Sequence, residues 1–301
     1  GSDKTAIVTE RVNAAFSHFE TSGDTYEIYV TKAPMDAPGK IKADAAENEK
    51  LHVYACGGDG TFNECVCGAA GLDNVCPFPT GTGNDFCRMF GEEKDMFRDL
   101  GALLCGSEHP IDLIDCNGRF CSNICSVGID ARIGTSVHNY SKIPVIGGAT
   151  GYVVSLIVNV LKGINRHMRV RIKDFYVDEE LALVCVCNGR YYGGGFNPSL
   201  TARPDDGVLD VFVVKKVGLI TLARMLGKYA SGHADECPQY ITRIQTDEVS
   251  ISFDEDNVIN IDGEAVFSKD VNIHVIHNAV KLIVPAGMKF FEQSAAAAAA
   301  V

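Results

Sequence analysis

Apolar and polar residues follow two different patterns along the first third of the chain. Apolar residues that recur at helical spacing predict helices at 6–19, 62–71 and 96–105. Alternating or short continuous apolar runs predict strands at 25–31, 51–56 and 75–78. Helices that alternate with short strands are typical of a parallel sheet covered by helices. The pattern therefore predicts a doubly wound α/β domain over residues 1–112.

Beyond residue 112 the pattern changes to short apolar runs separated by turn signals. These runs predict strands at 111–116, 119–127, 168–172, 181–187, 208–214, 249–253, 258–261 and 271–276. Two segments, 149–163 and 219–231, have helical spacing instead. A long series of short strands is typical of an antiparallel sandwich. We therefore expect an α/β plus all-β protein, with a β-sandwich domain over 113–285.

The composition of the chain limits the classes of function that it can have. The chain has 301 residues, 46% of them apolar, and a net charge of −12. The length favours about two domains, and the acidity argues against nucleic-acid binding as the main role. The start of the sequence shows no secretory leader, so we expect a cytoplasmic enzyme. None of the twelve cysteines forms a Cys-x-x-Cys pair; we expect small buried side chains of a cytosolic protein, with zinc binding as the alternative.

Two glycine-rich segments predict a phosphate-binding site. Gly57-Gly58-Asp59-Gly60-Thr61 directly follows the predicted strand 51–56, and Pro79-Thr80-Gly81-Thr82-Gly83-Asn84-Asp85-Phe86 follows about twenty residues later. Glycines let backbone N–H groups approach phosphate oxygens, and the helix that follows adds the positive end of its dipole. A carboxylate beside phosphate needs a cation, so we expect Asp59 to act through Mg²⁺. The alternative is a sharp turn that requires small residues.

Two further segments combine turn signals with carboxylates. Asp262-Gly263-Glu264 follows the predicted strand 258–261, so its two carboxylates could project toward a cleft; Asp-Gly is equally a hairpin signal. Arg203-Pro204-Asp205-Asp206-Gly207 has the residue types of a plain turn. For Asp85 the residues leave two roles open, capping the helix that follows or contacting a nucleotide.

Taken in order, these segments resemble the catalytic domain of the diacylglycerol kinase family, which includes bacterial lipid kinases and the sphingosine and ceramide kinases. The resemblance lies in Gly57–Thr61 with Asn63 and Glu64, in Pro79–Phe86, in Gly193-Gly194-Gly195-Phe196, in Ala202–Asp210 and in Ile261–Glu264. It therefore covers nearly the whole chain, and several separated motifs in one order are more specific than any one alone.

The resemblance implies roles for individual residues. ATP would contact Gly57, Gly58, Gly60, Thr61, Glu64, Thr80, Gly81, Thr82, Gly83 and Asn84. Asp262 would take or orient the proton of the attacking hydroxyl, with Glu264 supporting the metal or the aspartate. Asp206 would hold a structural Mg²⁺ with the backbone carbonyls of Arg203 and Val208, and Asp112 matches a further acidic position of the family.

We therefore expect an ATP- and Mg²⁺-dependent lipid kinase whose cleft lies between the two domains, with 286–294 returning to the first domain as the family implies. Its expected reaction transfers the γ-phosphate of ATP to a lipid alcohol, with diacylglycerol giving phosphatidic acid as the first candidate. An NAD kinase-like phosphotransferase remains an alternative, because NAD kinases share the GGDGT loop. A non-catalytic lipid- or nucleotide-binding relative remains another, because the family's first strand and its Asn-Pro-x-x-Gly loop are missing from the sequence.

The sequence also suggests where a membrane could be contacted. Residues 143–164 contain one charge, Lys162, and are followed by the basic residues Arg166, Arg169, Arg171 and Lys173. Interrupting glycines and polar residues favour a buried or amphipathic helix over a membrane span. We therefore expect peripheral, transient contact with a membrane surface. Whether the chain forms a homodimer stays open.

Overall fold

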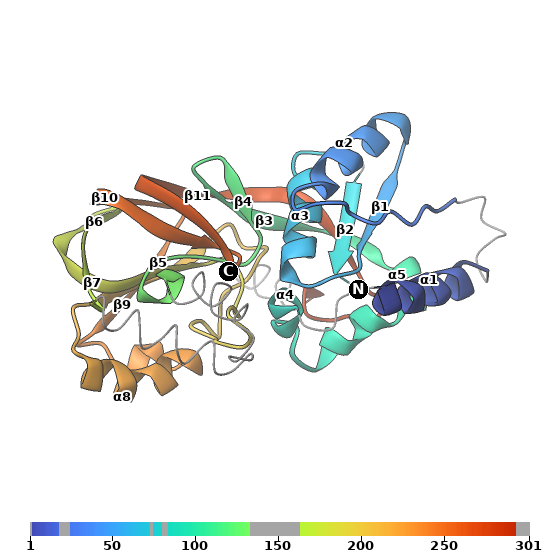
Figure 1. Cartoon of the computed structure of the whole chain (residues 1–301). Helices are drawn as coiled ribbons and strands as arrows, with labels where there is room; N and C mark the ends of the chain where they lie inside the picture. Colours follow the sequence, from blue (N-terminus) through green and yellow to red (C-terminus); the bar gives the residue numbers. More distant parts are fainter. Residues whose placement is uncertain (1, 18–24, 73–74, 80–83, 133–162, 293–301) are drawn as a thin grey trace. The chain divides into compact units, whose positions relative to one another are not determined.

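The computed structural model describes residues 2–17, 25–72, 75–79, 84–132 and 163–292 (Figure 1). The chain divides into two compact units. The first unit comprises residues 1–82, 90–110 and 280–301, and the second comprises 83–89 and 111–279. Residues 83–89, which the sequence pattern assigns to the first domain, cluster with the second unit.

The first unit is built from helices around a parallel strand pair. Strands β1 (Leu51–Ala55) and β2 (Val75–Pro79) pair in register from Leu51 opposite Val75 to Ala55 opposite Pro79. The other elements are α1 (Ser2–Ser17), α2 (Ala37–Glu47), α3 (Asp59–Ala69), the 3₁₀ helix η1 (Gly91–Arg98) and α5 (Leu100–Leu104). The β1–α3–β2 connection is the parallel unit that the alternating pattern predicts.

Close packing of two helices positions the start of α3. Gly68 of α3 approaches α2 so closely that a Cβ atom at this position would lie 2.9 Å from the Pro38 Cα atom. Phe62 and Val66 lie on the same buried face of α3. Because residues four apart share one face of a helix, this face packs inward while Asp59 stays at the open N-terminal end.

Several predictions for the first unit were wrong in detail. Residues 25–31 form no strand, since they have no ladder with a described strand; Tyr29 donates a hydrogen bond to Asp36. Helix α2 was not predicted. The helix predicted from residue 62 begins at Asp59, and the helix predicted at 96–105 divides into η1 and α5, since the Asp99 carboxylate caps α5 through Gly101 and Ala102 N–H.

A nine-stranded sheet dominates the rest of the chain. Its strands are β3 (Ser107–Cys116), β4 (Arg119–Cys121), β5 (Ile124–Gly128), β6 (Arg166–Ile172), β7 (Phe175–Cys187), β8 (Leu209–Lys215), β9 (Ile241–Thr246), β10 (Glu248–Ile261) and β11 (Glu264–Val284). The order is β4-β3-β11-β10-β5-β7-β8-β9, and β6 pairs with both β10 and β7. Strand β10 pairs with β6 near Ile251 and with β5 near Ile259.

Both faces of this sheet are buried around the C-terminal half of β7. On β7, Val184 and Val186 belong to one apolar cluster, whereas Cys185 and Cys187 belong to the other. The second cluster is completed by helix α8 (Leu219–Ala230), as Figure 1 shows beside β7 and β9. Eight of the eleven cysteines whose side chains are described are buried, and all eleven are free thiols.

The strand predictions were mostly confirmed, with shifted boundaries. Runs 249–253 and 258–261 are one strand, β10, with a register shift between Ser252 and Asn257. Run 119–127 is two strands, β9 was not predicted, and the predicted helix 219–231 is α8. The predicted helix 149–163 lies almost entirely outside the described residues. In the segment after β11, the Lys289 and Phe290 N–H groups donate to Glu93 within the first unit.

Candidate functional site

The GGDGT segment is the turn between β1 and α3. Gly58 is the N-cap residue of α3, and its carbonyl accepts the Phe62 N–H at 3.1 Å. A Cβ atom at Gly57 would overlap the Thr61 hydroxyl, so only glycine fits there, whereas Gly58 and Gly60 face open space. The first N–H groups of a helix lack intrahelical acceptors and attract anions. The turn therefore has the shape and the polarity of a phosphate cradle.

Asp59 is the first residue of α3 and is half-buried. A carboxylate in the first turn interacts favourably with the helix dipole, so Asp59 stabilises α3 whether or not it has a second role. The same position would place negative charge beside a bound phosphate, so a cation would be required between them. Thr61 and Glu64 follow on the same helix, and both are half-buried.

Thr80, Gly81, Thr82 and Gly83 lie outside the described residues. Asn84 caps helix α4 (Asp85–Arg88), since its side-chain oxygen accepts the Phe86 N–H at 3.1 Å. The interpretation of Asp85 as the cap was therefore wrong, because Asp85 already lies inside the helix. The Asn84 side-chain nitrogen is buried and has no acceptor among the described residues, as expected of a group next to a ligand or water site.

Asp85 is instead held by the glycine motif of the second unit. Its carboxylate accepts the Gly194 N–H at 2.6 Å and pairs with Arg88 Nε at 2.9 Å. Gly193, Gly194 and Gly195 all have positive φ angles, a conformation that glycine adopts without strain. Burial raises the pKa of Asp85 and the negative charge of Asp262 raises it further, against the Gly194 and Arg88 contacts. The role of this glycine run was not predicted.

Asp262 and Gly263 form the two-residue hairpin between β10 and β11. Their φ angles are 47° and 94°, and Ile261 pairs with Glu264 across the turn. Positive φ angles at both positions match the twist of a tight hairpin. The hairpin interpretation is thus confirmed, and it leaves Glu264 exposed beside the turn. A catalytic role for either carboxylate stays a prediction.

The Asp262 carboxylate does more than form a turn. One oxygen accepts N–H groups from Ile124 at 2.9 Å and Asn123 at 3.1 Å, and the other accepts the Ser122 N–H at 2.6 Å and its hydroxyl at 2.9 Å. Burial raises the pKa of Asp262, and the N–H groups of Ile124 and Ser122 oppose the rise. Asp262 therefore anchors the hairpin on the segment that connects β4 and β5.

Asn188, just after β7, connects this anchor to Asp112. Its side-chain nitrogen donates to the backbone carbonyls of Asp112 and Ser122, each at 2.9 Å. Asp112 is fully buried and accepts the N–H groups of Gly207 at 2.7 Å and Asn278 at 2.8 Å. His277 Nδ1 lies 2.7 Å from the same carboxylate. Through the Gly207 N–H, Asp112 anchors the 203–208 turn; its predicted place at a metal site stays a prediction.

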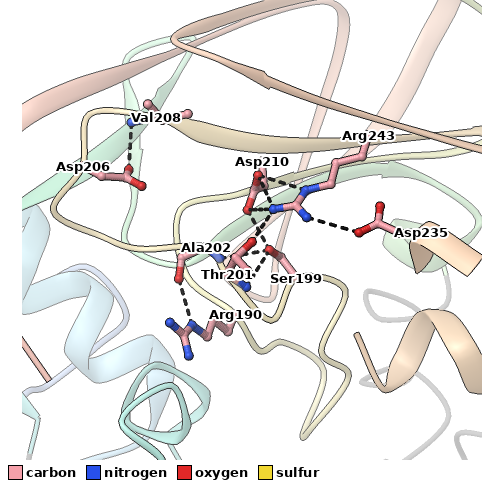
Figure 2. Close-up of polar contacts among 9 residues, drawn as sticks. All are labelled: Arg190, Ser199, Thr201, Ala202, Asp206, Val208, Asp210, Asp235 and Arg243. Carbon is pink, nitrogen blue, oxygen red and sulfur yellow. Dashed lines mark hydrogen bonds and ion pairs between the residues drawn. The ribbon is translucent and has the colours of Figure 1, made fainter. Parts of the chain in front are cut away.

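The ARPDDGVLD motif is held by a polar network shown in Figure 2. Arg243 contacts Asp210 at 2.9 Å, Ser199 Oγ donates to Asp210 at 2.7 Å, and the Ala202 carbonyl accepts Arg190 Nε at 2.9 Å. Asp235 makes an exposed contact with the same arginine at 3.3 Å. The network fixes the backbone of the motif at its two ends, Ala202 and Asp210.

Asp206, inside that motif, is the carboxylate best suited to a cation. Arg203 is paired with Asp205 at 2.9 Å, whereas Asp206 accepts only the Val208 N–H, at 3.0 Å, among the described residues. Asp206 is exposed as a residue, but partial burial of its carboxylate, together with the charge of Asp112, raises its pKa to about 6. A bound cation would relieve this penalty. Within the described ranges no three His, Cys, Asp or Glu side chains gather as metal ligands, so backbone carbonyls would have to complete the set.

Within the second unit, the structure connects Asp85, Asp262, Asp112 and Asp206 through short hydrogen-bonded segments. Asp59, Thr61 and Glu64 belong to the first unit. Sequence reasoning missed the supporting residues Ser122, Asn188, Arg243 and His277, and it placed Asp210 in a motif without giving it a role. In the sequence they are marked only by neighbouring turn or motif residues, as Asn188 is by Gly189.

Comparisons with known proteins agree with this architecture. Residues 3–116 match the diacylglycerol kinase catalytic domain model, and residues 123–284 match the YegS C-terminal NAD kinase beta sandwich-like domain model. The chain belongs to the diacylglycerol kinase catalytic-domain family. The predicted α/β plus β-sandwich class is thereby confirmed.

Individual members of the diacylglycerol kinase family are distant relatives. A Staphylococcus aureus (strain MRSA252) protein named "Putative lipid kinase" is 26% identical over 247 residues, which are 81% of this chain and 80% of that protein. A Bacillus anthracis (strain Sterne) structure described as a diacylglycerol kinase has a TM-score of 0.63 at 23% identity, over 87% of this chain and 86% of that chain. A second structure from that strain, described as "a putative diacylglycerol kinase", has a TM-score of 0.65 at 26% identity, over 85% of each chain.

A buried carboxylate beside the glycine motif predicts a pH effect in this family member. Tyr192 donates a hydrogen bond to Asp130 at 2.9 Å, and burial raises the pKa of Asp130 to about 6. The folded state then binds this proton more tightly than the unfolded state, so Asp130 destabilises the fold increasingly as pH rises from 4 to 6. Asp130→Asn should gain roughly 2 kcal/mol relative to the parent between pH 4.5 and pH 7.

The measurement is the free energy of unfolding by denaturant at both pH values. Asp174→Asn, an exposed aspartate in the turn between β6 and β7, is the control and should show no such gain. An Asp130→Asn difference that is the same at both pH values would contradict the assignment.

Proposed function

We propose that this member of the diacylglycerol kinase family is an ATP- and Mg²⁺-dependent kinase that transfers the γ-phosphate of ATP to the hydroxyl of a lipid alcohol, with diacylglycerol as the first substrate to test. The proposal rests on two carboxylates of the family's motifs, Asp59 and Asp262, and on the local structure around each of them. Asp59 stands at the open N-terminus of α3, and Asp262 is anchored at the β10–β11 hairpin. Both are expected at a phosphoryl-transfer site.

The residues would divide the chemistry as follows. The N–H groups at the start of α3 would bind phosphate oxygens, with the glycines allowing close approach. Asp59 would position Mg²⁺, whose charge would neutralise the phosphates when bound. Asp262 would orient the attacking hydroxyl or accept its proton, for which a raised pKa is suitable. Asp206, with the carbonyls of Arg203 and Val208, would hold a second Mg²⁺ that orders the turn without contacting ATP.

The test is transfer of labelled phosphate from ATP to lipid alcohols in mixed micelles with Mg²⁺, with NAD supplied in a parallel reaction. Labelled phosphatidic acid would support diacylglycerol kinase activity. Labelled NADP would support the NAD kinase alternative instead, and ATP binding without transfer to any alcohol would support the non-catalytic alternative.

The role of Asp59 gives a separate prediction. Asp59→Asn should lower kcat about 100-fold or more, because metal-ion charge stabilisation contributes several kcal/mol to such transition states. The Mg²⁺ concentration needed for half-maximal rate should rise at the same time. Steady-state rates across a Mg²⁺ titration measure both quantities. Glu47→Gln, which changes an exposed carboxylate on α2, is the control. If Asp59→Asn leaves the Mg²⁺ dependence unchanged, Asp59 does not bind the metal.

A further inference from the structure

Asp130, just after β5, carries a carboxylate that the proposed chemistry does not use. It accepts the Tyr192 hydroxyl at 2.9 Å, and the Ser126 hydroxyl also stabilises its ionised form. Although Asp130 is only half-buried as a residue, burial of its carboxylate raises the pKa to about 6. Its charge therefore costs stability at neutral pH. Carboxylates perturbed in this way gather at functional sites.

The contact with Tyr192 connects Asp130 to the glycine motif. The Tyr192 backbone closes this loop, because its N–H donates to the Phe196 carbonyl and its carbonyl accepts the Phe196 N–H, each at 2.9 Å. Between these two residues, the Gly194 N–H donates to Asp85 at 2.6 Å. Asp130 thus holds the base of the loop whose tip contacts Asp85.

The contact with Ser126 connects Asp130 to the hairpin between β10 and β11. Ser126 on β5 pairs with Asn260 on β10, and the side-chain nitrogen of Asn260 donates to the Ser126 hydroxyl at 3.3 Å. The side-chain oxygen of Asn260 accepts the Gly263 N–H at 2.9 Å. Ser126 and Asn260 are both buried, so water does not compete for these bonds. The second contact therefore leads to the turn that carries Asp262.

The ionised carboxylate sets the direction of these hydrogen bonds. A carboxylate only accepts, so the Tyr192 and Ser126 hydroxyls must both donate to Asp130. The Ser126 oxygen is then left to accept from the Asn260 amide. A protonated Asp130 has a donor of its own, so one of the two hydroxyls must turn away and a buried donor loses its acceptor. Loss of the charge therefore weakens the connection to one segment or to both.

Among the described groups that face Asp130, no other changes its charge between pH 5 and pH 7. Burial raises the pKa of Tyr192, Tyr229 and Cys187 well above their ordinary values. Burial lowers the pKa of Arg132 to about 10, so this guanidinium stays protonated over the whole range. Asp130 is thus the titrating group of this part of the described structure.

We propose that Asp130 is a positioning residue of the kinase site, whose ionised carboxylate holds the Asp85 loop through Tyr192 and the Asp262 hairpin through Ser126. It acts through these residues and not on the reacting atoms. The proposal rests on the proposed function for the activity that is measured, whereas the hydrogen bonds belong to the fold. As pH rises through 6, ionisation of Asp130 should raise kcat while it lowers the stability of the fold.

The first test compares kcat of the parent and of Asp130→Asn at saturating Mg²⁺ between pH 5 and pH 7.5. The parent should be about 10- to 100-fold faster at pH 7.5, since small displacements of catalytic groups cost up to that factor, and the two rates should converge towards pH 5. Asp206 and the other carboxylates titrate in both proteins, so the ratio of the rates reports on Asp130. Asp174→Asn, in the exposed turn between β6 and β7, is the control and should keep a ratio near one at every pH.

The free energy of unfolding separates positioning from folding. As pH rises through 6, Asp130→Asn should gain stability relative to the parent, because it lacks the buried charge. It should lose activity relative to the parent over the same range. A role in folding alone would change stability and activity in the same direction, so a parallel change of both would overturn the proposal.

Amide hydrogen exchange tests each contact without a kinase assay. Tyr192→Phe should speed exchange in the segment 193–197 and leave the segment 260–264 unchanged, whereas Ser126→Ala should do the opposite. Asp130→Asn should speed exchange in both segments at pH 7.5, and much less at pH 5, relative to the parent at the same pH. Equal exchange of the parent and Asp130→Asn in both segments at pH 7.5 would refute the positioning role.

The two measurements distinguish failure of this proposal from failure of the proposed function. If the parent transfers phosphate to no alcohol while Asp130→Asn speeds exchange in both segments in a pH-dependent way, the proposed function fails and the positioning of the two segments is retained. If the parent is active and its rate ratio to Asp130→Asn is the same at pH 5 and pH 7.5, the positioning role fails and the proposed function is retained.

Discussion

Replacing Asp262 by alanine is expected to lower kcat for phosphate transfer by about 100- to 10,000-fold, the range for loss of a positioned acid–base group. The substitution removes a carboxylate whose pKa is raised by burial, which makes it a better proton acceptor than an exposed aspartate. Binding of ATP should persist, because the GGDGT turn belongs to the first unit. The measurement is kcat for diacylglycerol phosphorylation together with the dissociation constant for ATP.

Two controls separate chemistry from folding at Asp262. Ser122→Ala removes one of the donors to the carboxylate, a 2.9 Å contact, and should cost about 1 kcal/mol of stability while changing kcat less than tenfold. Glu264→Gln changes the exposed carboxylate at the other end of the hairpin and reports on the predicted supporting role. If Asp262→Ala retains the parental kcat, Asp262 is an anchor only and the proton must be handled elsewhere.

Replacing Asp210 by alanine is expected to give the largest loss of stability, about 3–5 kcal/mol, the cost of removing one partner from a buried ion pair. Asp210 is 2% exposed and accepts hydrogen bonds from both Arg243 and the Ser199 hydroxyl, so the substitution removes the acceptor of Ser199 and leaves Arg243 with Thr201 and the exposed Asp235 (Figure 2). Because the network also holds the ARPDDGVLD turn, the ordering of Asp206 should be lost with it. Thermal unfolding should show a decrease in Tm of about 10 °C.

The same arginine provides the control for this prediction. Asp235→Ala removes an exposed partner of Arg243, and exposed pairs contribute about 0–1 kcal/mol. The combined replacement Asp210→Leu with Arg243→Met should recover part of the lost stability, since an apolar pair leaves no buried charge uncompensated. Equal stability losses in Asp210→Ala and Asp235→Ala would contradict the assignment of Asp210 as the buried anchor.

Local patterns predicted elements whose burial follows from their own sequence. Strands β1, β2, β7 and β8 were predicted because they are apolar runs bounded by turn signals, and α8 because its spacing is helical. Elements that depend on a partner were missed or misplaced. Residues 25–31 alternate like a strand but have no ladder, and β10 reads as two strands because its register shift between Ser252 and Asn257 interrupts the apolar pattern.

The candidate site likewise contains residues that the sequence predicted and residues that it could not predict. Motif spacing predicted Asp59 at a strand-to-helix turn and Asp262 at a hairpin, since glycine and aspartate have strong local conformational preferences. The residues that support them could not be predicted. Ser122 lies 140 positions from Asp262, and Asp112 lies 165 from His277, so only the pairing of distant strands brings each pair together.

The sequence by itself determined the family, the α/β and all-β halves, and the two carboxylates at Asp59 and Asp262, because these depend on short motifs and on local periodicity. The tertiary structure alone decided that Asn84 rather than Asp85 caps α4 and that Gly194 holds Asp85. These features depend on which distant backbone groups and side chains meet, and long-range contacts leave no periodic signal in the chain.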